Sequence, residues 1–223
     1  MYQDCWLKNK CTGVDCNSDF CLRRYKMDEL FNLSMLTDFH KLDIALRVDA
    51  DKGDLESFTY LKSIENNIEK FVSIGDNLYI HSPVCGNGKT SWAVKLLKAY
   101  LNKIWYKTDL VCRGLFIHVP RFLLEIKDNI SRKSDYVQYI KDNAIDADLV
   151  VFDEVGTKNL TSFEHEHILN IINTRMEYGK ANIFTSNLTN SEMLDKLGPR
   201  LYSRIVNNSQ NVPLVGGDKR GLR

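Results

Sequence analysis

The chain has 223 residues, with 30 basic and 29 acidic side chains and a net charge of +1. This balance excludes a protein that binds nucleic acid through its overall charge, so any such contact must come from a local patch. The hydrophobic and charged fractions, 43% and 26%, are ordinary for a globular chain, and we expect one main domain with a small appendage.

The sequence shows neither a membrane span nor a signal peptide. No apolar run approaches the roughly 18 residues of a spanning helix. Residues 1–6 lack the basic and apolar regions of a secretory leader. We therefore expect a cytoplasmic protein whose cysteines are reduced.

Residues 1–26 form a short polar segment with four of the six cysteines: Cys5, Cys11, Cys16 and Cys21. Reduced thiols in a segment too small for a hydrophobic core favour a bound metal, and four thiolates would hold Zn²⁺. The spacing lacks C-x2-C pairs, so an iron–sulfur cluster or free redox thiols are alternatives. Residues 27–55 are predicted to form a helical linker.

Residues 56–223 alternate short apolar runs with helical patterns. Strands are predicted at 77–82, 115–119, 149–152 and 181–186, with helices at 91–105, 121–128, 136–143 and 163–178. This alternation, with continuous apolar strands, predicts an α/β fold with a parallel sheet covered on both faces. The ligand of such a sheet lies beyond the carboxyl ends of its strands.

A phosphate-binding motif follows the first predicted strand. Residues 83–90 read P-V-C-G-N-G-K-T and match the Walker A pattern, except that Pro83 takes the place of the first glycine. The strand before the motif and the helix after it are the expected context. The alternative is a glycine-rich turn with a surface lysine.

The residue types in this motif suit a nucleoside triphosphate. Gly86 and Gly88 would let backbone N–H groups approach phosphate oxygens, and the next helix would add its N-terminal dipole. Lys89 would reach the β- and γ-phosphates, and the Thr90 hydroxyl would bind Mg²⁺. The predicted nucleotide-binding residues here are Cys85, Gly86, Asn87, Gly88, Lys89, Thr90 and Ser91.

The predicted strand at 149–152 runs into two adjacent carboxylates, as a Walker B strand does. We assign Asp153 to the Mg²⁺ site and Glu154 to the general base that polarises the attacking water. The alternative is a buried strand that ends in a polar loop.

The strand at 181–186 is followed by Asn187, which we predict to orient water beside the γ-phosphate. Thr185 and Ser186 are less favoured candidates for this role. A capping role for Asn187 before the next helix is the alternative.

Arg200 and Arg204 are four residues apart and share one face of a predicted helix. A guanidinium inserted into a neighbouring subunit's nucleotide site would stabilise transition-state charge. The alternative is a solvated basic face.

Taken in order, several motifs resemble those of the DnaC/DnaI/IstB-type AAA+ ATPases, and most of all phage and Gram-positive bacterial helicase loaders. They are P-V-C-G-N-G-K-T, L-V-V-F-D-E-V-G, I-I-N-T-R, I-F-T-S-N-L and L-G-P-R-L-Y-S-R-I. The resemblance covers residues 56–223. It implies an AAA+ sheet without a full lid domain and slow, switch-like hydrolysis of ATP with Mg²⁺.

The resemblance also implies roles for four arginines. Arg204 falls on the position of the trans-acting arginine finger, and Arg200 is the second candidate. Arg175 matches a recurring family arginine without an assigned role. Arg220 would approach the nucleotide in the manner of sensor 2.

The implied partners are those of a loader. The family binds ATP between subunits of a ring or spiral, contacts single-stranded DNA and places a hexameric replicative helicase on it. We expect the DNA contact at four basic residues in and after the helix at 121–128: Arg121, Lys127, Arg132 and Lys133. A solvated helix face is the alternative for these residues. The cysteine segment would dock the helicase or touch DNA. Two alternatives are an IstB-like transposition regulator on double-stranded DNA and a metal-binding adaptor that uses ATP structurally.

Overall fold

The computed structural model describes residues 18–42, 46, 53–128, 134–157 and 159–219, without the side chains of residues 18–20 and 128. Cys5, Cys11 and Cys16 therefore lie outside the described residues. The same holds for the predicted DNA contacts at Arg132 and Lys133.

Five parallel strands form a single sheet in the order β2-β3-β4-β1-β5. Their bounds are β1 Asn77–His81, β2 Gly114–His118, β3 Leu149–Asp153, β4 Ala181–Ser186 and β5 Gln210–Pro213. The four strands predicted from apolar runs are confirmed. Strand β5 was not predicted; it is a polar edge strand in which only Val212 is buried.

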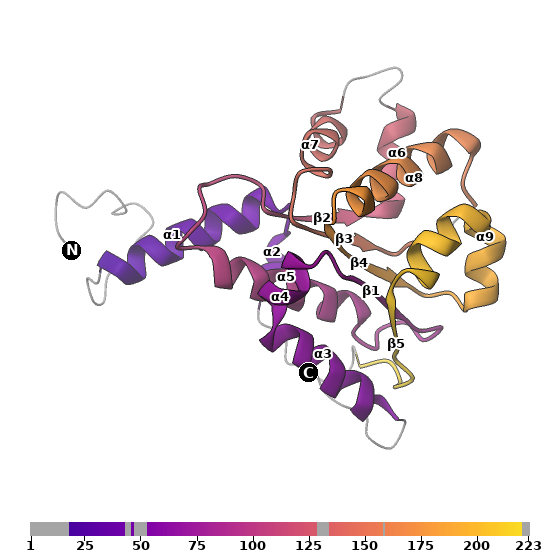
Figure 1. Cartoon of the computed structure of the whole chain (residues 1–223), viewed down its shortest axis with the longest axis horizontal. Helices are drawn as coiled ribbons and strands as arrows, with labels where there is room; N and C mark the ends of the chain where they lie inside the picture. Colours follow the sequence, from indigo (N-terminus) through magenta and orange to yellow (C-terminus); the bar gives the residue numbers. More distant parts are fainter. Residues whose placement is uncertain (1–17, 43–45, 47–52, 129–133, 158, 220–223) are drawn as a thin grey trace.

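Helices cover both faces of this sheet, as predicted (Figure 1). One face carries α1 Ser18–Leu33, α3 Asp54–Asn66, α4 Ile68–Ser73 and α5 Lys89–Ile104. The other carries α6 Val119–Asp128, α7 Asp135–Asn143, α8 Ser162–Glu177 and α9 Asn190–Tyr202. The short helix α2, Asp38–Lys41, lies beside α5.

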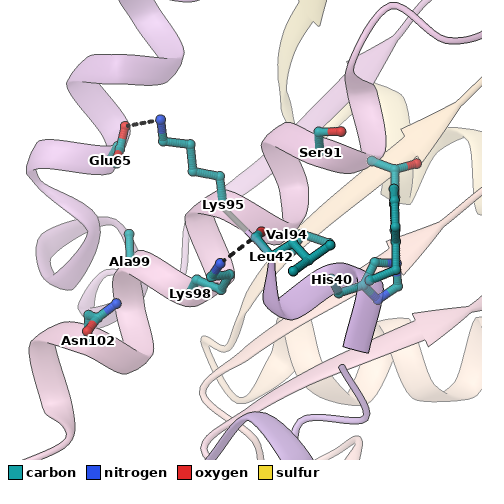
Figure 2. Close-up of a pocket in the computed structure, with 11 residues that line it drawn as sticks. His40, Leu42, Glu65, Ser91, Val94, Lys95, Lys98, Ala99 and Asn102 are labelled. Atoms are coloured by element: carbon teal, nitrogen blue, oxygen red, sulfur yellow. Dashed lines mark hydrogen bonds and ion pairs between the residues drawn. The ribbon is translucent and has the colours of Figure 1, made fainter. Parts of the chain in front are cut away.

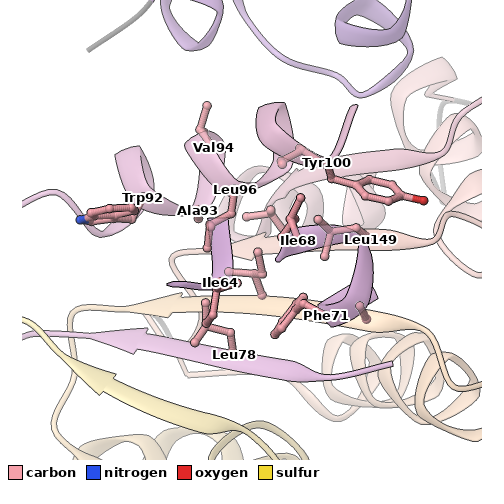
Figure 3. Close-up of a cluster of buried hydrophobic side chains, with 14 of the residues drawn as sticks. Ile64, Ile68, Phe71, Leu78, Trp92, Ala93, Val94, Leu96, Tyr100 and Leu149 are labelled. Carbon is pink, nitrogen blue, oxygen red and sulfur yellow. The ribbon is translucent and has the colours of Figure 1, made fainter. Parts of the chain in front are cut away.

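The side chains of each strand alternate between two cores. Leu78 and Ile80 of β1 pack with α5 and α3, whereas Tyr79 between them belongs to the opposite cluster with α8 and α9. Figure 3 shows the first cluster, in which Ile64, Phe71 and Leu96 gather above the sheet. Burial on both faces explains why the central strands read as continuous apolar runs.

Helix α1 is packed against the end of α5. Its Lys26 Nζ donates to the carbonyl oxygens of Trp105, at 3.4 Å, and Thr108, at 3.1 Å. Met27 and Leu30 are buried in the core beneath it. The helix thus runs through the predicted boundary between residues 26 and 27.

Beyond Arg204, the described chain through residue 219 completes a π-helix, forms β5 and then continues without regular structure. Within those residues no helical lid follows the sheet. None of the helices in the described part of the chain is long and apolar enough to cross a membrane.

Candidate nucleotide-binding site

The predicted phosphate loop joins β1 to α5 at the carboxyl edge of the sheet. Gly86 and Gly88 have φ angles of 74° and 106°, in the left-handed region where a side chain is strained. Asn87 holds the loop to its surroundings, because its Nδ2 donates to Ser82 Oγ at 2.6 Å and to the Leu214 carbonyl at 3.1 Å. The positive φ angles of Gly86 and Gly88 favour glycine at both positions, whether or not a ligand is bound.

The Lys89 side chain is turned back into this loop. It is only 7% exposed, and its Nζ donates to the Val84 carbonyl at 2.7 Å and to Asn87 Oδ1 at 3.2 Å. A largely buried ammonium at a helix N-terminus makes the loop electropositive, which suits a phosphate.

Asp153 joins three elements of the site. Its Oδ1 accepts hydrogen bonds from Thr90 Oγ1, at 2.8 Å, and from Thr185 Oγ1, at 2.7 Å. These contacts bring the start of α5 and the ends of β3 and β4 together. The carboxyl is 3% exposed, and burial raises its pKa against the opposing effect of the two hydroxyl groups.

This oxygen set fits a magnesium ion. Mg²⁺ prefers one or two carboxylates, water and substrate phosphates, and Asp153 with Thr90 supplies a carboxylate and a hydroxyl beside the phosphate loop. A cation there would offset the desolvation that raises the pKa of the Asp153 carboxyl.

Glu154 follows in a strained conformation, with φ at 59°. Its backbone N–H donates to Thr185 Oγ1 at 3.0 Å. Its carboxylate Oε2 lies 3.3 Å from Nε2 of His118, at the end of β2. The predicted general base is thus positioned by β4 and contacted from β2.

Three polar residues at the end of β4 were candidates to orient water, with Asn187 as the predicted one. Asn187 lies directly after β4 and is half-buried. Thr185, which the sequence analysis ranked below it, is fully buried and hydrogen-bonded to both Asp153 and Glu154. Ser186 turns the other way and donates to the Val155 carbonyl at 2.8 Å.

The C-terminal segment borders the phosphate loop on another side. The backbone N–H of Lys219 donates to the Gly86 carbonyl at 3.0 Å. Asp54, at the start of α3, is fully buried and accepts from the N–H groups of Val215, at 2.7 Å, and Gly216, at 3.1 Å. Arg220, the predicted sensor 2-like residue, lies just beyond the described residues.

A cavity of about 310 Å³ opens beside the start of α5 (Figure 2). Thr90 and Ser91 form one end of it, and Lys98 closes its side by donating to the Leu42 carbonyl at 3.2 Å. Cys85, in the loop itself, is exposed. Of the predicted nucleotide-binding residues that the structure describes, Thr90 and Ser91 are the ones that line this cavity.

The predicted arginines occupy different places. Arg200 and Arg204 are exposed, at the end of α9 and in the following π-helix, Ser203–Asn207. Arg175 is fully buried at the opposite, amino edge of the sheet, where it donates to Asn182 Oδ1 at 2.6 Å and to nearby carbonyls. Arg175 is therefore a structural tether between α8 and β4.

The predicted cysteine metal site cannot be located within the described residues, where only Cys21, half-buried on α1, represents it. In that part of the chain, no three His, Cys, Asp or Glu side chains are grouped to hold a metal ion. Zinc stays a prediction from cysteine spacing.

The five parallel strands in the order β2-β3-β4-β1-β5, with helices on both faces, match the fold of solved DnaC and DnaA structures. No protein-family model matches the sequence, and no curated protein matches it.

Solved structures resemble the fold at low sequence identity. The crystal structure of the DnaC helicase loader superposes with a TM-score of 0.61 and 18% identity, over 83% of this chain and 98% of DnaC. The crystal structure of DnaI gives 0.55 and 20%, over 77% and 88%. The initiator DnaA bound to AMPPCP and single-stranded DNA gives 0.57 and 18%, over 76% of this chain and 48% of DnaA. At these identities the likeness establishes the fold.

Proposed function

We propose that this protein is an ATP-dependent helicase loader that binds ATP at subunit interfaces and delivers a hexameric replicative helicase to single-stranded DNA. The observation that carries the proposal is the 2.8 Å hydrogen bond between Thr90 and Asp153. It joins the Walker A and Walker B segments at one edge of a sheet whose strand order is that of the AAA+ fold.

Each residue of the site has a defined task in this proposal. Lys89 and the loop amides hold the phosphates, and Thr90 with Asp153 would hold Mg²⁺. The ion supplies charge compensation on the phosphate oxygens. Glu154 accepts a proton from water as that water attacks the γ-phosphate. Asn187 orients the water, and Thr185 holds Asp153 and Glu154 in place.

Hydrolysis in this proposal needs a second copy of the chain. Arg204, with Arg200 as the second candidate, is exposed and reaches the nucleotide site of a neighbouring subunit. Self-association into a ring or spiral follows from this role. Arg220 would contact the nucleotide from the C-terminal segment.

The remaining partners are also proposals. DnaC is described as a helicase loader, and the DnaA structure contains single-stranded DNA. The DNA contact in this chain is assigned to Arg121 and Lys127, both exposed on α6. The Arg121 guanidinium is held over the Tyr136 ring at 4.2 Å and pairs with Glu125 at 2.7 Å, so it is oriented before DNA binds.

The cysteine segment is assigned to Zn²⁺ and to docking of the helicase. Elemental analysis of the purified full chain distinguishes zinc from iron. One equivalent of zinc supports the assignment, iron supports the cluster alternative, and neither metal leaves the four cysteines as thiols.

The substitution Glu154→Gln tests the ATPase assignment. It keeps the size of the side chain but removes the base, so we expect single-turnover hydrolysis to fall by roughly 10²-fold or more, within the usual range for a lost general base. Binding of a fluorescent ATP analogue should be retained. Unchanged hydrolysis would show that Glu154 is not the base.

The loader assignment is tested by co-purification. The Glu154→Gln variant with ATP should retain a hexameric replicative helicase better than wild-type protein with ADP. Recovery of a transposase instead, together with binding to double-stranded DNA, would identify an IstB-like regulator and contradict the proposal.

A further inference from the structure

The segment that carries Arg200 and Arg204 is a broken helix. Within α9, Gly198 has φ 72° and ψ 168°, which interrupts the helix, and Pro199 starts a new turn. The chain then continues as the π-helix Ser203–Asn207. A break of this kind leaves carbonyl groups of the preceding turn without their usual partners and lets the segment after it take several orientations.

One residue of α8 provides a hydrogen-bond partner for a carbonyl group at the break. The ring Nε2 of His165 lies 3.1 Å from the carbonyl oxygen of Leu197, the residue just before Gly198. Since a carbonyl oxygen can only accept, His165 must carry its proton on Nε2. This hydrogen bond fixes the end of the first half of α9.

A second residue of α8 holds the arginine itself. Asn173 Oδ1 accepts a hydrogen bond from Arg204 Nε at 2.8 Å. Because the bond uses Nε, the two terminal nitrogens of the guanidinium lie at the outer end of an exposed side chain. His165 and Asn173 are eight residues apart on one helix, so α8 is hydrogen-bonded to the broken segment on both sides of Gly198.

We propose that Asn173 is a positioning residue for Arg204, with His165 as its counterpart at the helix break. The inference rests on the proposed trans role of Arg204. A long arginine side chain loses rotamer freedom when it enters a neighbour's site, and a contact that already restricts it lowers that entropic loss. Asn173 therefore acts on the rate through Arg204 and touches no nucleotide.

The test uses the full-length chain with four substitutions on α8, among them His165→Ala, and with Arg204→Ala as a reference background. Asn173→Ala removes the acceptor, and Asn173→Asp keeps an oxygen that can accept from Arg204. Asn170→Ala changes the same residue type on an exposed turn of the same helix and serves as the matched control. Steady-state ATP hydrolysis is measured over a range of protein concentrations, with sedimentation to compare self-association.

For Asn173→Ala, we expect kcat to fall roughly 10-fold with KM unchanged, the effect of one lost hydrogen bond to a charged group. Asn173→Asp and Asn170→Ala should stay close to wild type. In an Arg204→Ala background, Asn173→Ala should cause no further loss, because the residue it positions is absent. His165→Ala should lower kcat in the same way.

Three results would overturn the inference, and each is distinguishable from a failure of the proposed function. If Arg204→Ala slows hydrolysis while Asn173→Ala does not, or if the two effects add, Asn173 does not position the arginine and the ATPase assignment stands. If a fall in kcat is explained by lost self-association, Asn173 is only structural. If wild-type protein hydrolyses no ATP, or Arg204→Ala hydrolyses it normally, the trans role itself fails.

Discussion

At the scale of single residues, Glu154 is constrained at two points. The backbone N–H of Glu154 donates to the Thr185 hydroxyl at 3.0 Å, and the ring of His118 contacts the Glu154 carboxylate at 3.3 Å. The strained backbone of Glu154 fixes the direction in which its side chain leaves β3. His118 thus competes with water for the carboxylate.

We expect His118→Ala to raise basal ATP hydrolysis by roughly 1.4- to fivefold. A half-exposed contact of this kind is worth at most about 0.2–1 kcal/mol, which corresponds to that change if releasing Glu154 makes it available to water. Steady-state ATPase measurements check this, with Glu154→Gln as the background in which the effect must vanish. A slower His118→Ala enzyme would instead mean that the histidine assists hydrolysis.

Thr185 illustrates what the sequence could and could not reveal at this scale. The sequence predicts where the strand ends, and Asn187 stays the predicted water-orienting residue. Strand alternation places Thr185 on the same face as Ile183, where α5 lies, and Thr185 is paired in register with Ile80 of β1. His118 could not be found, because nothing in the sequence shows that the ends of β2 and β3 adjoin.

At the scale of elements, the segment after β5 packs along one side of the phosphate loop and is hydrogen-bonded to it. The Asn87 side-chain amide donates a hydrogen bond to the Leu214 carbonyl at 3.1 Å, and the N–H of Lys219 donates to the Gly86 carbonyl at 3.0 Å. The buried Asp54 carboxylate fastens the same segment to the first turn of α3. Three stretches that are distant in the sequence thus share one hydrogen-bonded frame.

We expect Asp54→Ala to lower the free energy of unfolding by about 2–3 kcal/mol, since it leaves buried N–H groups without their charged acceptor. ATP binding should weaken as well, because the segment beside the loop is released. Urea denaturation and nucleotide titration measure the two effects. Glu56→Ala, an exposed acid in the same helical turn, is the control and should cost about 0.5 kcal/mol. Equal effects of both substitutions would show that the frame is unimportant.

The elements also show where sequence patterns stop being informative. The other four strands, of which β2 is the opposite edge, were predicted because burial on both faces makes them largely apolar. The edge strand β5 has one buried side chain and no periodic pattern, so its pairing with β1 depends on tertiary contacts. The role of Asp54 likewise depends on residues more than 150 positions away.

At the scale of the whole molecule, the sheet with its two layers of helices includes α1 as a full member of one layer. Met27 and Leu30 are buried with residues of α5 and α3, and Lys26 caps the end of α5. Residues 27–55 were predicted to be a helical linker, and the polar sequence of α1 has almost no amphipathic pattern that would indicate its docking. Its docking depends on a few well-placed contacts.

Leu30→Ala tests this integration. Leu30 is 1% exposed, so the substitution should lower the free energy of unfolding by about 2–4 kcal/mol in a single cooperative transition. Leu22→Ala, on the same helix at 42% exposure, should change stability by less than about 0.5 kcal/mol. Urea unfolding followed by circular dichroism measures both. A separate early transition for α1 would show that it unfolds independently of the sheet.

The seating of α1 on α5 has a thermodynamic consequence. The helix that α1 grips at one end begins, at its other end, with Lys89 and Thr90. A partner that binds the amino-terminal region and shifts α1 would change the affinity for nucleotide, and nucleotide would change the affinity for that partner by the same factor. Helix α5 would then couple the binding of a partner at α1 with the binding of nucleotide at the phosphate loop.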